Sequence, residues 1–468
     1  MKLTLNKPDI NRTPKDYTRI AFVAEKGVRR LVRENGVQTI ELSVPEKLNL
    51  RKFVILCRAV VAAAKQYKAR KIALDFNQTP ELWKGLADVP AGRIAQAAAE
   101  NFEMANFEFR TYKTKPKEGW TEIEEIMVCG PQTKETLAGA KKGQIIGQGV
   151  NACRELANTP GGDITPRKLA AAAKAAAKGL PITVTTLGRA QMEKLGMGAL
   201  LGVAKGSSEE PTFTIMEYKG AAGAPIVLAG KGITFDSGGL NLKPSNSIYE
   251  MHMDMSGAAA VIQAVAIAAR LKLKRRVIGL VPSAENMPGN NAYRPGDVLK
   301  SLSGKTIEVL NTDAEGRLIL ADAITYAKKF KPAVVIDAAT LTGAALTALG
   351  LYASGLLTCD DKLAQTLSEL GETSGDYVWR LPLWDEYEEA LKGQFADLSN
   401  IGTGQTGRYG GAIEGGMFLW QFAKELDCPW AHLDIAPRMT AAPGDELAKG
   451  AAGAPVRLLV SFIESWKG

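Results

Sequence analysis

Residues 229–260 hold four side chains that could act together in catalysis. The segment reads AGKGITFDSGGLNLKPSNSIYEMHMDMSGAAA and contains Lys231, Asp236, Lys243 and Asp254. Glycines and serines separate these four residues and allow the tight turns that can direct several side chains to one point. The segment therefore predicts a loop-built site of lysines and carboxylates.

A second segment, residues 311–327, supplies two more carboxylates and an arginine. It reads NTDAEGRLILADAITYA, where Asp313, Glu315 and Arg317 precede a run with helical patterning. Taken alone, Asp313 is explained as a helix N-cap and Glu315 as a favourable charge in the first turn. Beside the first segment, however, the chain offers four carboxylates on two glycine-rich loops, and this combination favours a catalytic site.

Four carboxylates gathered in a protein interior repel one another unless cations neutralise them. Two divalent ions would balance their charge, and oxygen ligands suit magnesium, manganese or zinc. Two such ions about 3.5–4 Å apart can share a hydroxide and polarise a carbonyl group. A lysine loses its proton readily beside cations, so one lysine could ligate a metal while the other stays charged. Arg317 stays protonated and would hold an anion or developing negative charge.

Histidine offers little alternative chemistry. The chain has two histidines, His252 and His432, and it lacks the H-E-x-x-H zinc motif. A Ser-His-Asp triad also needs a well-placed imidazole. Because His432 lies in the strand-like run WAHLDI, a paired core histidine is the better interpretation. Any catalysis would therefore depend mainly on carboxylates and lysines.

Two further glycine motifs do not indicate nucleotide binding. Residues 402–407 match G-x-G-x-x-G, but the dinucleotide fingerprint requires a strand directly before it, and here a polar stretch precedes it. Residues 230–232, Gly-Lys-Gly, lack the earlier glycine and the following Ser or Thr of a P-loop. Both motifs are interpreted as loops.

Strand and helix patterns alternate around the two chemistry-bearing segments. Strands are predicted at 226–230, 276–283, 333–339 and 430–436, and helices at 257–271, 314–329 and 411–425. This order predicts an α/β fold with a mainly parallel or mixed sheet, in which chemistry gathers beyond the carboxyl ends of the strands. Nearly every polar residue of interest directly follows a predicted strand or precedes a predicted helix.

The first 130 residues predict a separate α/β domain without recognisable chemistry. Strands are predicted there at 19–24, 39–44, 70–76 and 124–130, with a helix over 51–67. Two more helices are predicted at 134–157 and 165–178. The break between them, Asn-Thr-Pro-Gly-Gly at 158–162, is the best candidate hinge.

Composition favours a soluble globular protein of about two domains. The 468 residues carry a net charge of +8, but 58 basic residues are scattered among 50 acidic ones, which disfavours a nucleic-acid partner.

Residues 333–357 could span a membrane by length, yet Asp337 and several glycines and threonines favour a buried strand, loop and helix. Five separated cysteines and an N-terminus without a signal-like apolar stretch predict a reducing, cytoplasmic compartment and no membrane partner.

The two segments resemble the signatures of the leucine aminopeptidase, or cytosol aminopeptidase, family. The family motif N-T-D-A-E-G-R-L is intact at 311–318, and GKGITFDSGG stands at 230–239. Further similar stretches are NAYRPGD at 291–297, ATLTGA at 339–344, GGAIEGGMFL at 410–419 and GAAGAPVRLLV at 450–460. The resemblance spans roughly residues 150–468, and the earlier residues match only in general α/β character.

This resemblance implies a metal-dependent aminopeptidase that hydrolyses N-terminal amino acids, leucine-like and others, from peptides through a hydroxide activated by two metal ions. The implied ligands of two Mn²⁺, Zn²⁺ or Mg²⁺ ions are Lys231, Asp236, Asp254, Asp313 and Glu315. Lys243 would polarise the scissile carbonyl group and stabilise the oxyanion. Arg317 would hold a bicarbonate ion that serves as general base.

The resemblance also implies residues that contact the substrate. Met251, Thr340 and Gly343 would line the first side-chain pocket, and the backbone carbonyl group of Leu341 would receive the substrate. His252 departs from the basic residue expected beside Met251. A hydrogen bond to a metal ligand is favoured for it over direct metal ligation.

The implied architecture is an N-terminal macro-like α/β domain over residues 1–133, a linking helical region over 134–179 and a catalytic α/β domain over 180–468 with a mixed central sheet. A cytoplasmic homohexamer acting on short peptides is implied as well. The alternative is a DNA-binding or regulatory protein on the same scaffold. An inactive metal-binding homologue is disfavoured, because Lys243 and Arg317 are both present.

Overall fold

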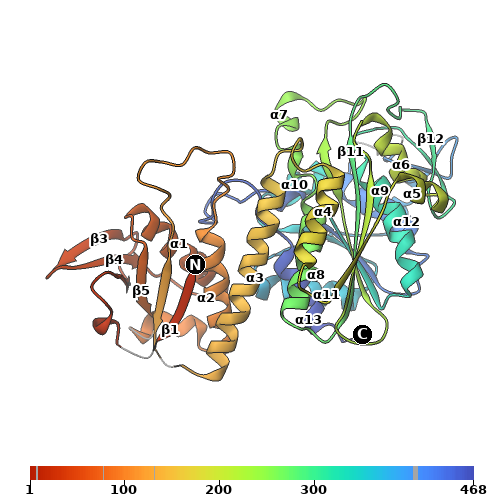
Figure 1. Cartoon of the computed structure of the whole chain (residues 1–468). Coiled ribbons are helices and arrows are strands. Elements are labelled where there is room, and N and C mark those ends of the chain that lie inside the picture. Colours follow the sequence, from red (N-terminus) through yellow and green to blue (C-terminus); the bar gives the residue numbers. More distant parts are fainter. Residues whose placement is uncertain (7–8, 77–78, 131, 404–408, 468) are drawn as a thin grey trace. The chain divides into compact units, whose positions relative to one another are not determined.

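The computed structural model places the chain in two compact units, and the residues it describes are 1–6, 9–76, 79–130, 132–403 and 409–467. The first unit comprises Met1–Asn151 and Pro443–Lys449, and the second comprises Ala152–Ala442 and Gly450–Gly468. Each unit contains a sheet with helices packed on it, which confirms the predicted α/β class (Figure 1). Positions 404–407 of the G-x-G-x-x-G motif lie outside the described residues.

The first unit is built on a six-stranded sheet of strand order β1-β6-β5-β2-β4-β3. Its strands are β1 (Lys2–Asn6), β2 (Thr18–Val23), β3 (Arg29–Glu34), β4 (Val37–Ser43), β5 (Lys71–Asp75) and β6 (Glu125–Cys129). Neighbouring strands are parallel except β3 and β4, which form an antiparallel hairpin. Asn35 and Gly36 make its two-residue turn with φ angles of 49° and 76°, a conformation that these residue types favour.

Three helices accompany this sheet, α1 (Leu50–Gln66), α2 (Ala91–Asn106) and α3 (Lys134–Asn158), and α3 contributes to both units. Glycines spaced four residues apart along α3 let it approach α2 closely. A Cβ atom at Gly139 would lie 2.0 Å from the Gly92 carbonyl oxygen, and one at Gly143 would lie 2.2 Å from the Gln96 carbonyl oxygen. Alanine at either glycine would therefore force the two helices apart.

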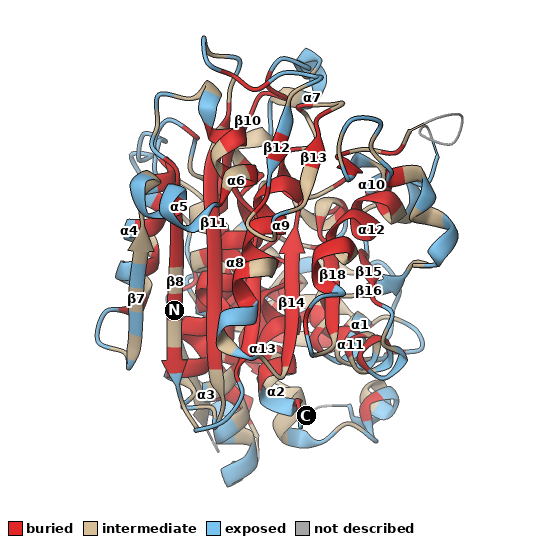
Figure 2. Cartoon of the chain, turned by 90° about the vertical axis from the view of Figure 1, so that its right-hand side faces the viewer, coloured by how far each residue is buried: buried red, intermediate tan, exposed pale blue. Residues whose placement is uncertain are grey.

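The second unit contains a nine-stranded mixed sheet of order β16-β15-β18-β14-β9-β11-β8-β7, with β10 paired to β11. Its strands are β7 (Ile182–Leu187), β8 (Thr212–Lys219), β9 (Ile226–Gly230), β10 (Gly232–Asp236), β11 (Arg276–Asn286), β14 (Val334–Ala339), β15 (Ser354–Leu357), β16 (Val378–Arg380) and β18 (Trp430–Asp434). The four central strands β18, β14, β9 and β11 are parallel and almost entirely buried (Figure 2). A small sheet of β12 (Val298–Lys300), β13 (Thr306–Glu308) and β17 (Leu398–Ser399) completes the unit.

Helices cover the central strands. The buried helix α8 packs against β9, β11 and α13, whereas α9 packs against α6 and α12. The helices are α4 (Pro166–Ala177), α5 (Arg189–Leu195), α6 (Gly198–Val203), α7 (Ser245–Ile248), α8 (Ser256–Arg270), α9 (Gly316–Ala327), α10 (Gly343–Leu349), α11 (Asp361–Ser374), α12 (Gly411–Ala423) and α13 (Val456–Ser465). Because α8 and α9 begin beside the carboxyl ends of β9 and β14, both chemistry-bearing loops are brought to one edge of the sheet.

Within the part of the chain that the structure describes, one helical stretch, Met251–Arg270, is long and apolar enough to cross a membrane by length and composition alone. It is 89% buried inside the protein, as a core helix of a globular domain would be. The other apolar stretch, residues 333–357, forms β14, a loop, α10 and β15. The predicted strand, loop and helix are therefore confirmed for that stretch.

Candidate metal centre

The carboxyl ends of two strands deliver the first chemistry-bearing segment. Lys231 directly follows β9, and Asp236 is the last residue of β10. Both strands run parallel to β11, so their ends lie at the same edge of the sheet. Gly238 and Gly239 then turn the chain with φ angles of 86° and 65°, which glycine adopts without strain.

Small residues also let the second segment approach the first. A Cβ atom at Gly238 would lie 3.0 Å from Asp313 Oδ1, and one at Gly239 would lie 2.9 Å from Thr312 Oγ1. At Gly316, the first residue of α9, a Cβ atom would lie 2.4 Å from the Cε atom of Lys231. Larger side chains at these glycines would separate the two loops.

Lys231 joins residues from three loops and is only 2% exposed. Its Nζ atom donates to Asp254 Oδ1 at 2.8 Å and to the Thr340 carbonyl oxygen at 2.9 Å. The same nitrogen lies 2.8 Å from Glu315 Oε1. Asp254 comes just before α8 and Glu315 just before α9, so Lys231 connects the starts of both helices.

Lys243 lies at the more open side of the cluster. Its Nζ atom is 2.9 Å from Asp236 Oδ2 and 2.6 Å from Asp313 Oδ1. The Lys243 side chain is 15% exposed and that of Asp313 is 32% exposed, against 2% for Asp236. This side of the cluster is therefore the one that a substrate can reach.

The carboxylates fit divalent cations. Ligand oxygens of Asp236, Asp313 and Glu315 all lie within 4.8 Å of one another. The Oε2 atom of Glu315 is buried, and no described residue forms a hydrogen bond with it. A buried carboxylate oxygen without a partner is costly unless a cation binds it. The oxygen-rich donor set, with one nitrogen from Lys231, therefore suits manganese, zinc or magnesium.

The electrostatics of the site follow from burial and crowding. Burial, together with the Glu315 charge, raises the pKa of Asp236 to about 7, against the opposing effect of the two lysines. Burial also raises the pKa of Asp254 and that of Asp313. Burial would raise the pKa of Glu315 as well, but the charges of Lys231 and Lys243 outweigh it and lower this pKa. The cluster thus carries more negative charge than its two lysines can stabilise.

The two lysines are held in their charged form. Burial alone would lower the pKa of Lys231, but Asp254, Glu315 and Asp236 outweigh it and raise this pKa. The pKa of Lys243 is raised in the same way, chiefly by Asp236. Ligation of a metal ion through Lys231 Nζ would therefore require a cation to displace the proton.

Arg317 lies on the first turn of α9, beside the carboxylates but not bonded to them. Its Nη1 atom donates to the Asn400 carbonyl oxygen at 2.8 Å. Its buried Nε atom forms no hydrogen bond with any described residue. Burial lowers the pKa of Arg317, against the charges of Glu414 and Glu315, but an arginine remains a cation. The Nε–H group of Arg317 is therefore available to donate a hydrogen bond to an anion.

Of the four residues predicted to contact substrate, Thr340 has a contact with the carboxylate cluster. Thr340 directs its hydroxyl group to Asp254 Oδ1 at 2.6 Å, so it also orients a carboxylate of the site. The backbone nitrogen of Leu341 donates to Asp434 Oδ1 at 3.1 Å. Gly343 is exposed, and a Cβ atom there would meet no atom within 4 Å. Met251 belongs to a short 3₁₀ helix and is half-buried.

Among the described residues, neither histidine forms a hydrogen bond or ion pair with the carboxylates of the cluster. The imidazole of His252 interacts with the backbone of Tyr249, and burial lowers its pKa. His432 is fully buried, with its Nδ1 atom 2.5 Å from Asp337 Oδ1. His432 is therefore the paired core histidine that its strand pattern predicts.

Three polar residues that support the site were not predicted from the sequence. Asn286 and Asp434 are the last residues of β11 and β18, and Tyr293 donates through its hydroxyl group to the Thr312 carbonyl oxygen at 2.7 Å. Asp434 accepts from the Thr342 hydroxyl group at 2.7 Å and holds the loop that contains Leu341. A polar residue at the carboxyl end of an apolar strand is the signal that could have identified Asn286 and Asp434.

Comparisons with known proteins show which family the sequence resembles. The sequence profile of the cytosol aminopeptidase family, catalytic domain, matches residues 151–460. A probable cytosol aminopeptidase from Azoarcus is 52% identical over 340 residues, which cover 72% of this chain and 66% of that relative. The chain therefore spans just under two thirds of the Azoarcus protein. A probable cytosol aminopeptidase from Chlorobaculum parvum is 42% identical over 464 residues, which cover 97% of this chain and 91% of the relative.

Solved structures resemble the whole chain. The bottromycin maturation enzyme BotP in complex with Mn is 32% identical with a TM-score of 0.85, covering 97% of this chain and 99% of its own. A tomato leucine aminopeptidase mutant is 30% identical with a TM-score of 0.88, covering 99% of this chain and 96% of its own. These similarities extend over both compact units.

Proposed function

The chain belongs to the cytosol aminopeptidase family of metal-dependent aminopeptidases, and we propose that it releases N-terminal residues, leucine-like ones among them, from peptides. The observation that carries this proposal is the convergence of four carboxylates and two lysines where β9, β10, α8 and α9 meet. Such a cluster lies where α/β proteins place their chemistry. The alternative of a DNA-binding or regulatory protein gains no support from the relatives named above.

Two divalent cations are proposed for the cluster. Their ligands would be Lys231, Asp236, Asp254, Asp313 and Glu315. When bound, such ions polarise a carbonyl group and lower the pKa of water. Manganese is supported by the Mn complex of BotP, and zinc or magnesium also suits the donor set.

Two cationic side chains would act on the reacting groups. The Lys243 ammonium group, on the open side of the cluster, would donate to the substrate carbonyl oxygen and stabilise the negative charge that develops there. The free Nε atom of Arg317 would bind bicarbonate, which would take up the proton of the attacking water.

The substrate is proposed to lie between Lys243 and the loop at 340–343. Thr340, Gly343 and Met251 would line the pocket for the first side chain, and Leu341 would offer its backbone carbonyl group. The open space at Gly343 supports this placement.

Hydrolysis of leucine p-nitroanilide by manganese-loaded protein tests the proposal. Asp313→Ala and Glu315→Ala should each lower kcat/KM at least a hundredfold and reduce the bound metal measured by elemental analysis. Asp361→Ala changes an exposed aspartate and serves as the matched control. The proposed peptidase activity would be refuted if the parent protein did not hydrolyse the substrate. It would also be refuted if the two ligand variants and the Asp361→Ala control hydrolysed it equally.

A cytosolic homohexamer with a macro-like first unit is proposed as well. The names of the relatives support the compartment. With a chain of 50.0 kDa, light scattering should give a mass of about six chains, and a monomer or dimer would contradict the hexamer.

A further inference from the structure

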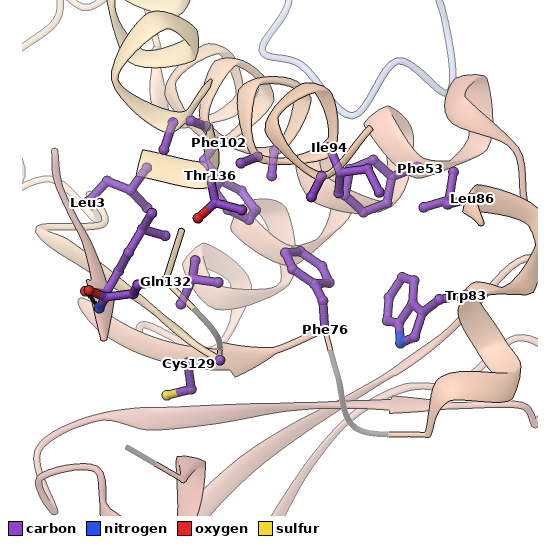
Figure 3. A pocket seen from close by; sticks show the side chains of 18 of the residues that line it. Leu3, Phe53, Phe76, Trp83, Leu86, Ile94, Phe102, Cys129, Gln132 and Thr136 are labelled. Atoms are coloured by element: carbon purple, nitrogen blue, oxygen red, sulfur yellow. Dashed lines mark hydrogen bonds between the residues drawn. The ribbon is translucent and has the colours of Figure 1, made fainter. Parts of the chain in front are cut away.

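The first unit contains a cavity that shares no residue with the candidate metal centre. Its volume is 340 Å³, within the range of small-molecule sites in proteins. Side chains of β1, β6, α1, α2 and α3 line it, together with Phe76 after β5, the residues Trp83, Leu86 and Ala87, and the loop residues Gly130 and Gln132 (Figure 3). All of these lining residues belong to Met1–Asn151, so the cavity lies within one compact unit.

Aromatic and aliphatic groups make up most of the cavity wall. The rings of Phe53 and Phe76 lie 5.4 Å apart, and those of Phe76 and Trp83 lie 5.2 Å apart in an edge-on arrangement. Alanines of α2, including Ala95, leave the opposite wall shallow. Tilted and edge-on rings beside a wall of small side chains favour a flat, aromatic ligand.

Charge is absent from the lining. None of the described residues around the cavity is an aspartate, glutamate, lysine, arginine or histidine. An ionised ligand would therefore lose its hydration without gaining a partner of opposite charge, and that loss is costly. The ligand that fits this cavity is uncharged.

Two polar side chains, those of Gln132 and Thr136, lie at one end of the cavity. Figure 3 shows Gln132 and Thr136 on the side of the cavity away from Trp83. The Gln132 amide nitrogen donates to the Leu5 carbonyl oxygen, so the amide is fixed in orientation. A Gln132 side chain also carries a carbonyl oxygen, which accepts a hydrogen bond from a hydroxyl or N–H group of a ligand.

We propose that this cavity binds an uncharged two-ring aromatic molecule with one hydrogen-bond donor directed toward Gln132. Size supports two rings, because a dry apolar cavity of about 150 Å³ holds one benzene molecule. The 340 Å³ available here is about twice that volume. The chemistry is that of a naphthol or an indole.

Calorimetric titration of the full-length protein with 2-naphthol and 2-naphthoate tests the charge and size requirements. We expect one 2-naphthol site per chain and at least tenfold weaker binding of the similarly sized but charged 2-naphthoate. Ala95→Phe should fill the cavity and weaken 2-naphthol binding at least tenfold. Ala138→Phe, on the exposed side of α3, is the matched control and should bind within twofold of the parent.

A milder variant keeps the test decisive if Ala95→Phe does not fold. Gln132→Leu should weaken 2-naphthol binding at least fivefold but leave naphthalene binding within twofold. No saturable 2-naphthol binding by the parent protein would overturn the proposal. Equal binding by Ala95→Phe and Ala138→Phe would also overturn it, as would equal effects of Gln132→Leu on both ligands.

Discussion

The side-chain amide of Asn286 donates to Asp236 Oδ1 at 2.8 Å, and the same nitrogen donates to the Thr312 carbonyl oxygen at 2.9 Å. Asn286 ends β11, whereas Asp236 and Thr312 belong to the two chemistry-bearing loops. One rigid strand end thereby fixes the position of Asp236, a proposed metal ligand, relative to the loop that carries Asp313 and Glu315. Residues that orient metal ligands in this way affect metal binding without touching the metal.

Asn286→Ala should therefore weaken metal binding by about 10–100-fold, a range typical of lost support for a ligand. Activity titrated against manganese concentration measures the change, and saturating manganese should restore much of the rate. Asn246→Ala, an exposed asparagine on α7, is the control. A metal requirement equal to that of the parent would show that Asn286 does not position Asp236.

Lys243 allows catalysis to be separated from metal binding. Lys243→Met removes a positive charge that faces Asp236 and Asp313 at 2.9 and 2.6 Å, so the cluster becomes more negative and metal affinity should not fall. The turnover number kcat should nevertheless fall by about 10²–10³-fold, as for loss of one oxyanion donor. Metal content and kcat, measured on one preparation, check both parts. A loss of metal that parallels the loss of rate would assign Lys243 to the metal site instead.

The buried pair of His432 and Asp337 makes a pH-dependent contribution to the stability of the folded state. Burial would lower the pKa of His432, but the Asp337 carboxylate 2.5 Å away outweighs it and raises this pKa above the ordinary 6.5. The folded state then binds the proton more tightly than the unfolded state. The stabilisation is fully present below pH 6.5 and is lost as the pH rises through the folded pKa.

His432→Gln should accordingly destabilise the protein more at pH 6 than at pH 9. Removing one partner of a buried ion pair costs about 3–5 kcal/mol of stability. This cost is expected at pH 6, where His432 is protonated and the pair is charged. Urea unfolding of the parent and variant at both pH values measures the difference. An equal loss at both pH values would mean that His432 is neutral throughout.

Long apolar runs made the main elements predictable from the sequence. The runs at 226–230 and 333–339 become β9 and β14, and the periodic stretch at 257–271 becomes α8. The antiparallel strand β8 was not predicted. Its alternating pattern, TFTIMEYK, identifies a strand only once its pairing with β7 and β11 is known. Strands of three residues or fewer, such as β12 and β17, are too short to carry a periodic signal.

The proposed site was predictable where chemistry and spacing coincide. Lys231, Asp236 and Glu315 lie on glycine-rich loops and were identified by residue type, and the structure brings them together. Asn286 and Asp434 belong to no charge pattern, so only the register of β11 and β18 reveals what they hold. The hydroxyl bond from Thr340 to Asp254 likewise joins residues far apart in the sequence.

Gly316 tests whether close packing of the two loops matters. It is the first residue of α9, and exposed helical glycines usually gain up to about 1 kcal/mol of stability on replacement by alanine. Here the added Cβ atom would lie 2.4 Å from Lys231 Cε and 2.7 Å from Lys231 Nζ. Gly316→Ala must therefore displace Lys231 from Asp254 and Glu315, and activity at limiting manganese should fall at least tenfold.

Gly162→Ala is the matched control for this change, because a Cβ atom there would meet nothing within 4 Å and the glycine has no left-handed φ angle. It should leave metal binding and peptide hydrolysis within twofold of the parent. Thermal unfolding of both variants separates a local displacement of Lys231 from general loss of structure. If Gly316→Ala binds manganese as tightly as Gly162→Ala does, Lys231 can move without cost, and its proposed role as a metal ligand fails.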